Sequence, residues 1–107
     1  MKLITKEIEA KLSKNSGKPN EKPYLKLFSP IGSATWLISE YDKSTGLLFG
    51  LCDLGMGFPE LGYVSLLEIQ ETTFPLGMKI ERDMYFSPSM TLSEYADQAR
   101  KDGCIIA

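Results

Sequence analysis

Two carboxylates lie in a short segment of the chain, residues 52–63, in which three glycines and a proline interrupt apolar side chains. Asp53 and Glu60 of this segment, together with Glu40, offer the oxygen ligands that Mg²⁺ prefers. A carboxyl group that is buried after an apolar run also has a raised pKa, which suits acid and base chemistry. The first hypothesis from these residues is therefore a histidine-free enzyme, or a ligand- or metal-binding protein, that works through Asp53 and Glu60.

A structural explanation competes with that hypothesis, and it is the one that we favour. An Asp at the end of a strand, shortly before a glycine, commonly accepts hydrogen bonds from backbone amides in an Asx-turn. A Glu that follows a proline caps a turn or faces water. Arg82 stands among alternating apolar residues, and a partly buried ion pair with Asp53 or Glu60 explains all three charged side chains without catalysis.

Several catalytic classes lack their usual residues in this chain. It contains no histidine, which is the commonest general base and transition-metal ligand and the usual partner of a nucleophilic Ser or Cys. Gly55 and Gly57, with the next glycine at Gly62, match neither the dinucleotide-binding glycine motif nor a P-loop. Cys52 and Cys104 are too few for a disulfide framework, and we expect free thiols, with Cys52 in the core. We assign no catalytic residue, no metal and no cofactor.

The apolar side chains of residues 52–63 indicate a second class of function. Such loop residues most often cover the core, but Met56 and Phe58 can instead point outward and form an apolar patch with nearby aromatic residues. A protein-interaction module that binds another protein through this patch is the function that we favour. The predicted binding residues are Trp36, Asp53, Met56, Phe58, Glu60, Tyr63 and Arg82.

Charge is distributed unevenly along the chain, although the net charge is only −2. Residues 1–26 carry seven lysines and three glutamates, whereas the remaining residues carry five basic and eleven acidic side chains. A third hypothesis is contact between the lysines and nucleic acid phosphates. The basic segment has no arginine and no aromatic residue before Tyr24, and the acidic remainder argues against nucleic acid as the main ligand, so we favour a solvated helix face. The lysines concerned are Lys6, Lys11, Lys14, Lys18 and Lys22.

Length and composition set the domain organisation. A chain of 107 residues, 43% hydrophobic and 24% charged, has the size and composition of one globular domain that needs neither metal nor disulfide for its core. The N-terminal residues lack the apolar stretch of a secretory signal, and the longest apolar run, Leu47–Cys52, is too short to cross a bilayer. We expect residues 1–107 to form a single cytoplasmic domain without membrane contact, and we assign no oligomeric state.

The pattern of apolar residues predicts an α+β fold, with a mainly antiparallel sheet of four to five strands, N-terminal and C-terminal helices and one short internal helix. Thr5 is the predicted N-cap of the first helix, and Ser/Thr-x-x-Glu capping boxes at residues 65–68 and 91–94 begin the other two. The last helix is expected to end at Gly103. The strands are predicted at Tyr24–Ser29, Ala34–Tyr41, Leu47–Asp53, Tyr63–Ser65 and, as a half-exposed edge, Met78–Phe86, with a mobile connector at residues 13–23.

Motifs spread over nearly the whole chain carry a family resemblance. They are residues 36–37 (Trp-Leu), 49–55 (Phe-Gly-Leu-Cys-Asp-Leu-Gly), 59–66 (Pro-Glu-Leu-Gly-Tyr-Val-Ser-Leu), 81–83 (Glu-Arg-Asp) and Phe86. Together they resemble a bacterial family catalogued as a domain of unknown function, whose members are small proteins often encoded on plasmids and other mobile elements. The resemblance implies a single domain, and it brings no activity, cofactor or catalytic residue.

Overall fold

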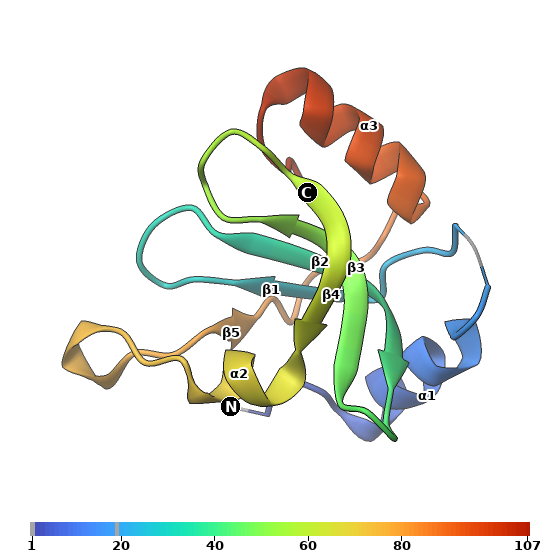
Figure 1. Cartoon of the computed structure of the whole chain (residues 1–107), viewed down its shortest axis with the longest axis horizontal. Coiled ribbons are helices and arrows are strands. Elements are labelled where there is room, and N and C mark those ends of the chain that lie inside the picture. Colours follow the sequence, from blue (N-terminus) through green and yellow to red (C-terminus); the bar gives the residue numbers. More distant parts are fainter. Residues whose placement is uncertain (1, 19) are drawn as a thin grey trace.

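The strands form one antiparallel sheet in the computed structural model, which describes residues 2–18 and 20–107. Met1 and Pro19, which the predicted domain includes, lie outside the described residues. The strand order is β4-β3-β2-β1-β5 (Figure 1), so β1 to β4 form a meander and β5 returns beside β1. The elements are α1 (Lys6–Asn15), β1 (Leu25–Phe28), β2 (Thr35–Asp42), β3 (Leu47–Asp53), β4 (Glu60–Ser65), α2 (Leu66–Glu71), a 3-10 turn (Pro75–Gly77), β5 (Glu81–Arg82) and α3 (Leu92–Asp102).

Helices cover both faces of this sheet, as the predicted α+β fold requires. Along β2, Trp36 and Ile38 pack in one hydrophobic cluster, and Leu37 between them packs in the other, because successive side chains of a strand point to opposite faces. The first cluster includes Leu12 of α1, and the second includes the apolar side of α3. We call these two sides of the sheet the α1 face and the α3 face. In Figure 1, α3 lies at the top of the view and α1 at the lower right.

The predicted starts of the three helices and the predicted end of the last helix are confirmed. The Thr5 hydroxyl accepts the Ile8 amide at 3.2 Å and begins α1, and the Ser65 hydroxyl accepts the Glu68 amide at 3.3 Å and begins α2. Thr91 begins α3 with a complete capping box, and α3 ends at Gly103, which has a left-handed φ of 78°. Local hydrogen-bonding chemistry therefore fixes where each helix starts, as capping rules predict.

The connector after α1 is shorter and better attached than the sequence suggests. α1 continues through residues 13–15, and the buried Asn15 side chain donates hydrogen bonds to the carbonyls of Ser39, at 3.1 Å, and Lys22, at 3.4 Å. The Glu21 carbonyl accepts the Leu92 amide at 3.0 Å. The polar residues that suggested a mobile loop are thus partly helical, and some of them satisfy backbone groups of β2 and α3. Mobility of the rest of residues 13–23 stays a prediction.

The predicted edge strand at Met78–Phe86 is wrong in extent, because β5 has two residues. A tight turn precedes it, in which the Phe74 amide donates to the Met78 carbonyl at 2.7 Å. After it, the Asp83 carboxylate accepts the Tyr85 amide at 2.9 Å. This Asx-turn ends the strand although the apolar alternation continues. In contrast, β4 is longer than the three residues predicted for it.

Candidate functional site

Asp53 has a structural role in the described part of the chain. Its side chain is buried, with 2% of its surface exposed, and its two carboxylate oxygens accept two backbone amides. Oδ1 accepts the Gly55 amide at 2.8 Å, and Oδ2 accepts the Ile105 amide at 3.0 Å. The predicted Asx-turn is therefore confirmed. The same carboxylate also ties the end of β3 to the chain that follows α3, a contact that no local pattern indicated.

The carboxylates that could have formed a catalytic or metal site do not converge. Glu60 pairs with Cys52 across β3 and β4, so it points to the face opposite that of Asp53, the next residue along β3. Glu40 lies farther along β2, where its Oε1 accepts the Gly17 amide at 3.0 Å. Among residues 2–18 and 20–107, no three His, Cys, Asp or Glu side chains are grouped so as to hold a metal ion. This arrangement leaves the carboxylate hypothesis without a site.

The predicted ion pair between Arg82 and Asp53 or Glu60 is wrong. Arg82 pairs with Leu27 and shares the α1 face with it, whereas Asp53 lies on the α3 face. Glu60 is on the same face as Arg82, but four strand spacings of about 4.8 Å separate β4 from β5, which makes roughly 19 Å. The Arg82 guanidinium donates to the Lys2 carbonyl at 2.7 Å. It therefore holds the N-terminal segment against the far edge of the sheet.

Trp36 does not belong to the surface either. Its side chain is 7% exposed and packs in the cluster on the α1 face. Strand alternation alone places Trp36 and Leu37 on different faces, but it does not tell which of the two faces a helix covers at that point. The structure therefore places Trp36, a predicted binding residue, in the core.

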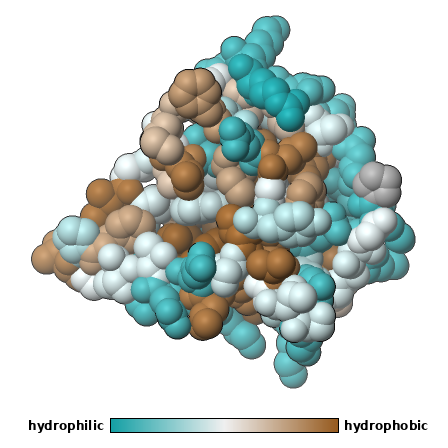
Figure 2. Space-filling view, viewed as in Figure 1, coloured by the Kyte–Doolittle hydropathy of each residue, from teal (hydrophilic) through white to brown (hydrophobic). Residues whose placement is uncertain are grey.

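The loop between β3 and β4 points its apolar side chains outward. Met56 is 70% exposed and Phe58 is 80% exposed, and Leu54 between β3 and these residues is also exposed. These apolar loop residues therefore do not cover the core, which is the commoner role of such residues. Gly55 and Gly57 have left-handed φ angles of 79° and 84°, which allow the loop to turn without folding its side chains inward. Figure 2 shows brown, apolar side chains at the upper left of the view, where this loop lies in Figure 1.

A second loop joins the first at the same end of the sheet. In an antiparallel meander, the β1–β2 and β3–β4 connections emerge together, and a Cβ placed on Gly55 would touch the Ser33 hydroxyl. Ile31 of the β1–β2 loop is exposed. Residues 30–33 and 54–59 contain no charged side chain, although 24% of the chain is charged. We call this uncharged region the loop-end surface, and its apolar members are Ile31, Leu54, Met56 and Phe58.

An open groove on the α3 face begins beside the exposed edge of the sheet. It has a volume of about 440 Å³, and its apolar lining comes from Phe49 of β3, Leu61 and Tyr63 of β4, and Leu92 at the start of α3. The rings of Phe49 and Tyr63 are in contact, with their centroids 4.9 Å apart. Tyr63, a predicted binding residue, is 69% exposed, so part of its ring is available to a ligand. We call this feature the edge groove.

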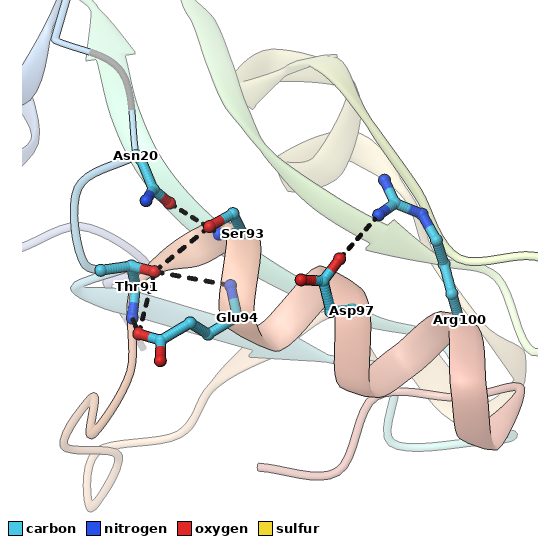
Figure 3. Close-up of polar contacts among 6 residues, drawn as sticks. All are labelled: Asn20, Thr91, Ser93, Glu94, Asp97 and Arg100. Atoms are coloured by element: carbon cyan, nitrogen blue, oxygen red, sulfur yellow. Dashed lines mark hydrogen bonds and ion pairs between the residues drawn. The ribbon is translucent and has the colours of Figure 1, made fainter.

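Polar contacts hold the wall of the edge groove at the start of α3. The Asn20 side-chain oxygen accepts the Ser93 amide at 3.0 Å, and Figure 3 shows Asn20 reaching over this end of the helix. The Glu94 carboxylate accepts the Thr91 amide and hydroxyl, each at 3.0 Å, and these bonds hold the pKa of Glu94 below its ordinary value. Three amides of the first turn, those of Leu92, Ser93 and Glu94, thus have partners within the chain, so the start of α3 supports the groove and is not an open anion site.

The lysines named for possible contact with nucleic acid lie in different surroundings. Lys11, Lys14 and Lys18 line a shallow hollow of about 290 Å³ with Tyr24, and the Lys11 ammonium lies 5.3 Å from the centroid of the Tyr24 ring. Lys22 lies instead close enough to Glu94 to affect its ionisation. Contact of these lysines with nucleic acid stays a prediction.

Both cysteines are free thiols, as predicted. Cys104 is exposed, and Cys52 is partly buried against the α1-face cluster. Burial raises the pKa of the Cys52 thiol, and the charge of Glu60, its partner across β3 and β4, raises it further. A thiol with a raised pKa is a poor nucleophile at neutral pH.

These features define a class of protein: a small α+β domain with helices on both faces of an antiparallel sheet, and with uncharged apolar loops and an open groove near one edge. No helix of the described chain has the length and apolar character needed to cross a membrane. A family model described as "Protein of unknown function (DUF2958)" matches residues 3–106, and the chain belongs to this family. No curated protein and no solved structure matches the chain.

Proposed function

We propose that this domain is a protein-interaction module that binds another protein through the loop-end surface and the adjoining β4. The observation that carries the proposal is the outward position of Met56 and Phe58 in a region without charge. Contiguous apolar patches on the surface of a monomeric protein often mark sites where it binds another protein. The buried carboxylate of Asp53 supports this role, because it fixes the base of the loop.

The energy available from these side chains is sufficient for a specific contact. Removing a fully exposed Phe or Met side chain from water contributes about 1.5–3 kcal/mol at roughly 25 cal/mol per Å². Phe58 and Met56 together thus supply several kcal/mol before the costs of association. As part of the same proposal, the domain meets its partner protein in the bacterial cytoplasm.

Affinity capture with matched variants tests this proposal. The tagged domain is incubated with a lysate of the bacterium that encodes it, and captured proteins are quantified for the wild type, Phe58→Ser and Tyr85→Ser. Tyr85 is the control because it is also an exposed aromatic residue, but it lies in the turn beyond β5. We expect Phe58→Ser to reduce at least one captured protein about tenfold or more, as a loss of about 1.4 kcal/mol or more requires, and Tyr85→Ser to retain it.

Circular dichroism and thermal unfolding of both variants establish that each remains folded. If every protein captured by the wild type is captured equally by Phe58→Ser, the loop-end surface is not the binding site. The same conclusion follows if Phe58→Ser and Tyr85→Ser lose the same proteins to the same extent, because the effect would then not depend on position.

A further inference from the structure

The two edges of the sheet differ in how well they are protected against pairing with another strand. β5 has two residues, and both of them, Glu81 and Arg82, are charged. Short length and charge are the devices by which natural proteins protect an exposed edge. β4 has six residues, and after Glu60 none is charged. One edge of this sheet is therefore closed to a further strand, and the other lacks these defences.

The outer side of β4 is also uncovered. β4 is terminal in the strand order of the described residues, and every one of its residues is exposed or half-buried. In Figure 1, β4 lies at the front of the molecule. An outer edge of this kind offers backbone N–H and C=O groups at the spacing of a strand about 20 Å long, at roughly 3.3 Å per residue.

The edge groove lies beside this edge on one face only. Leu61 and Tyr63 are two residues apart on β4, so both side chains point to the α3 face, and both line the groove. A strand added to β4 would direct every second side chain toward that face. Backbone hydrogen bonds along an edge, combined with apolar pockets for alternate side chains, are the features by which domains bind extended peptides.

We infer that β4 binds an extended segment of the partner protein as a sixth strand, and that alternate apolar side chains of this segment occupy the edge groove against Phe49, Tyr63 and Leu92. The inference rests on the proposed function, and it adds that the partner binds through an extended segment of its chain. The loop-end surface adds contacts at the β3–β4 end of the same strand.

A second copy of the chain is a poorer occupant than a peptide. Two copies joined through β4 would meet edge to edge, along a strip about 20 Å long and about one sheet layer, or 10 Å, wide. This strip is roughly 200 Å², whereas a stable interface covers about 800 Å² on each partner. A peptide is narrow enough to pair with β4 and to place side chains in the groove.

Peptides selected from a random dodecapeptide phage library against the full chain provide the probe. The best one is synthesised in three forms: unmodified, N-methylated at odd positions, and N-methylated at even positions. In an added strand, alternate amides point to β4 and to solvent, so we expect one methylated form to bind at least tenfold more weakly and the other to keep its affinity. Hydrogen exchange of amides within residues 60–65 should slow at least tenfold with the unmodified peptide.

Substitution of the edge gives the matched protein variants. Tyr63→Lys places a charge at the groove, and we expect it to weaken peptide binding at least tenfold, whereas Tyr85→Lys should leave it unchanged. Tyr85 is almost fully exposed, whereas Tyr63 also contacts the ring of Phe49, so circular dichroism and thermal unfolding must establish that Tyr63→Lys remains folded. Leu61→Lys serves as a second variant at the groove. Strand addition is refuted if no selected peptide depends on Tyr63 or Leu61, if the two methylated forms bind equally, or if β4 instead mediates a dimer that Tyr63→Lys dissociates.

These experiments can refute the proposed function and the strand addition independently of each other. If Phe58→Ser removes a captured protein while peptide binding is indifferent to backbone methylation, the interaction surface stands and strand addition is wrong. If the peptide protects β4 as expected but Phe58→Ser has no effect on capture, the loop-end surface is not used and the β4 edge is the binding site by itself.

Discussion

Replacement of Asp53 by Ala is expected to destabilise the domain. The carboxylate accepts two backbone amides, those of Gly55 and Ile105, and it is buried while the amides are partly accessible. A hydrogen bond to a charged group contributes about 1.5–3 kcal/mol, and the partial exposure of the amides places each bond near the lower value, so we expect a loss of about 3 kcal/mol in the free energy of unfolding.

Urea unfolding followed by fluorescence measures this loss, because the buried Trp36 reports on the α1-face core. Glu60→Ala is the control, since Glu60 is exposed and should change the free energy by less than about 0.5 kcal/mol. Asp53→Asn should fall between the two, because an amide oxygen can accept one of the bonds while its NH₂ group opposes the other donor. A loss below about 1 kcal/mol for Asp53→Ala, or equal losses for both alanine variants, would refute the structural role of this carboxylate.

Thr91→Ala should cost about 1 kcal/mol of stability in chemical denaturation, because it removes the N-cap of α3, and an unchanged midpoint would contradict this. The pKa of Glu94 is lowered by hydrogen bonds from Thr91, so its stabilisation is present above the ordinary carboxyl pKa and is lost as pH falls through the lowered value. Protection factors of amides in the first turn of α3, which are corrected for the intrinsic pH dependence of exchange, should therefore fall on acidification in the wild type and change less in Glu94→Gln. Iodoacetamide at pH 8 should alkylate Cys104 well before Cys52, whose pKa burial raises, and equal rates by intact mass would count against that assignment. Gly50→Ala should lower stability by more than about 2 kcal/mol or prevent folding, because a Cβ would overlap the backbone of β2, and a wild-type melting temperature would disprove the close approach of the two strands.

Local signals in the sequence were sufficient for most of the fold. Capping chemistry at Thr5, Ser65 and Thr91 marked the starts of the three helices, and each of those caps is present. Residues that are apolar on both alternations marked β2 and β3 as central strands, because a strand buried on two faces has no polar side. These features depend on residues close together in the chain, which a sequence displays directly.

Features that depend on distant residues were not predictable in the same way. The ion pair proposed for Arg82 required knowledge of the strand order, which places β5 and β4 at opposite edges. The second amide bound by Asp53 comes from Ile105, more than fifty residues away. Ile31 escaped notice because its loop becomes part of a surface only when the meander brings it beside Gly55. The Asx-turn at Asp83 was visible in principle, since an Asp side chain commonly accepts the backbone amide two residues further along the chain.

Amide hydrogen exchange of the whole chain, with and without the protein that it captures, tests the interaction surface most directly. The expected result is slower exchange on binding within residues 30–33 and 54–65, with little change in α1 and in the turn beyond β5. Protection confined to the lysine hollow of α1, or to the β5 edge, with the loops and β4 unchanged, would contradict the assignment of the binding site.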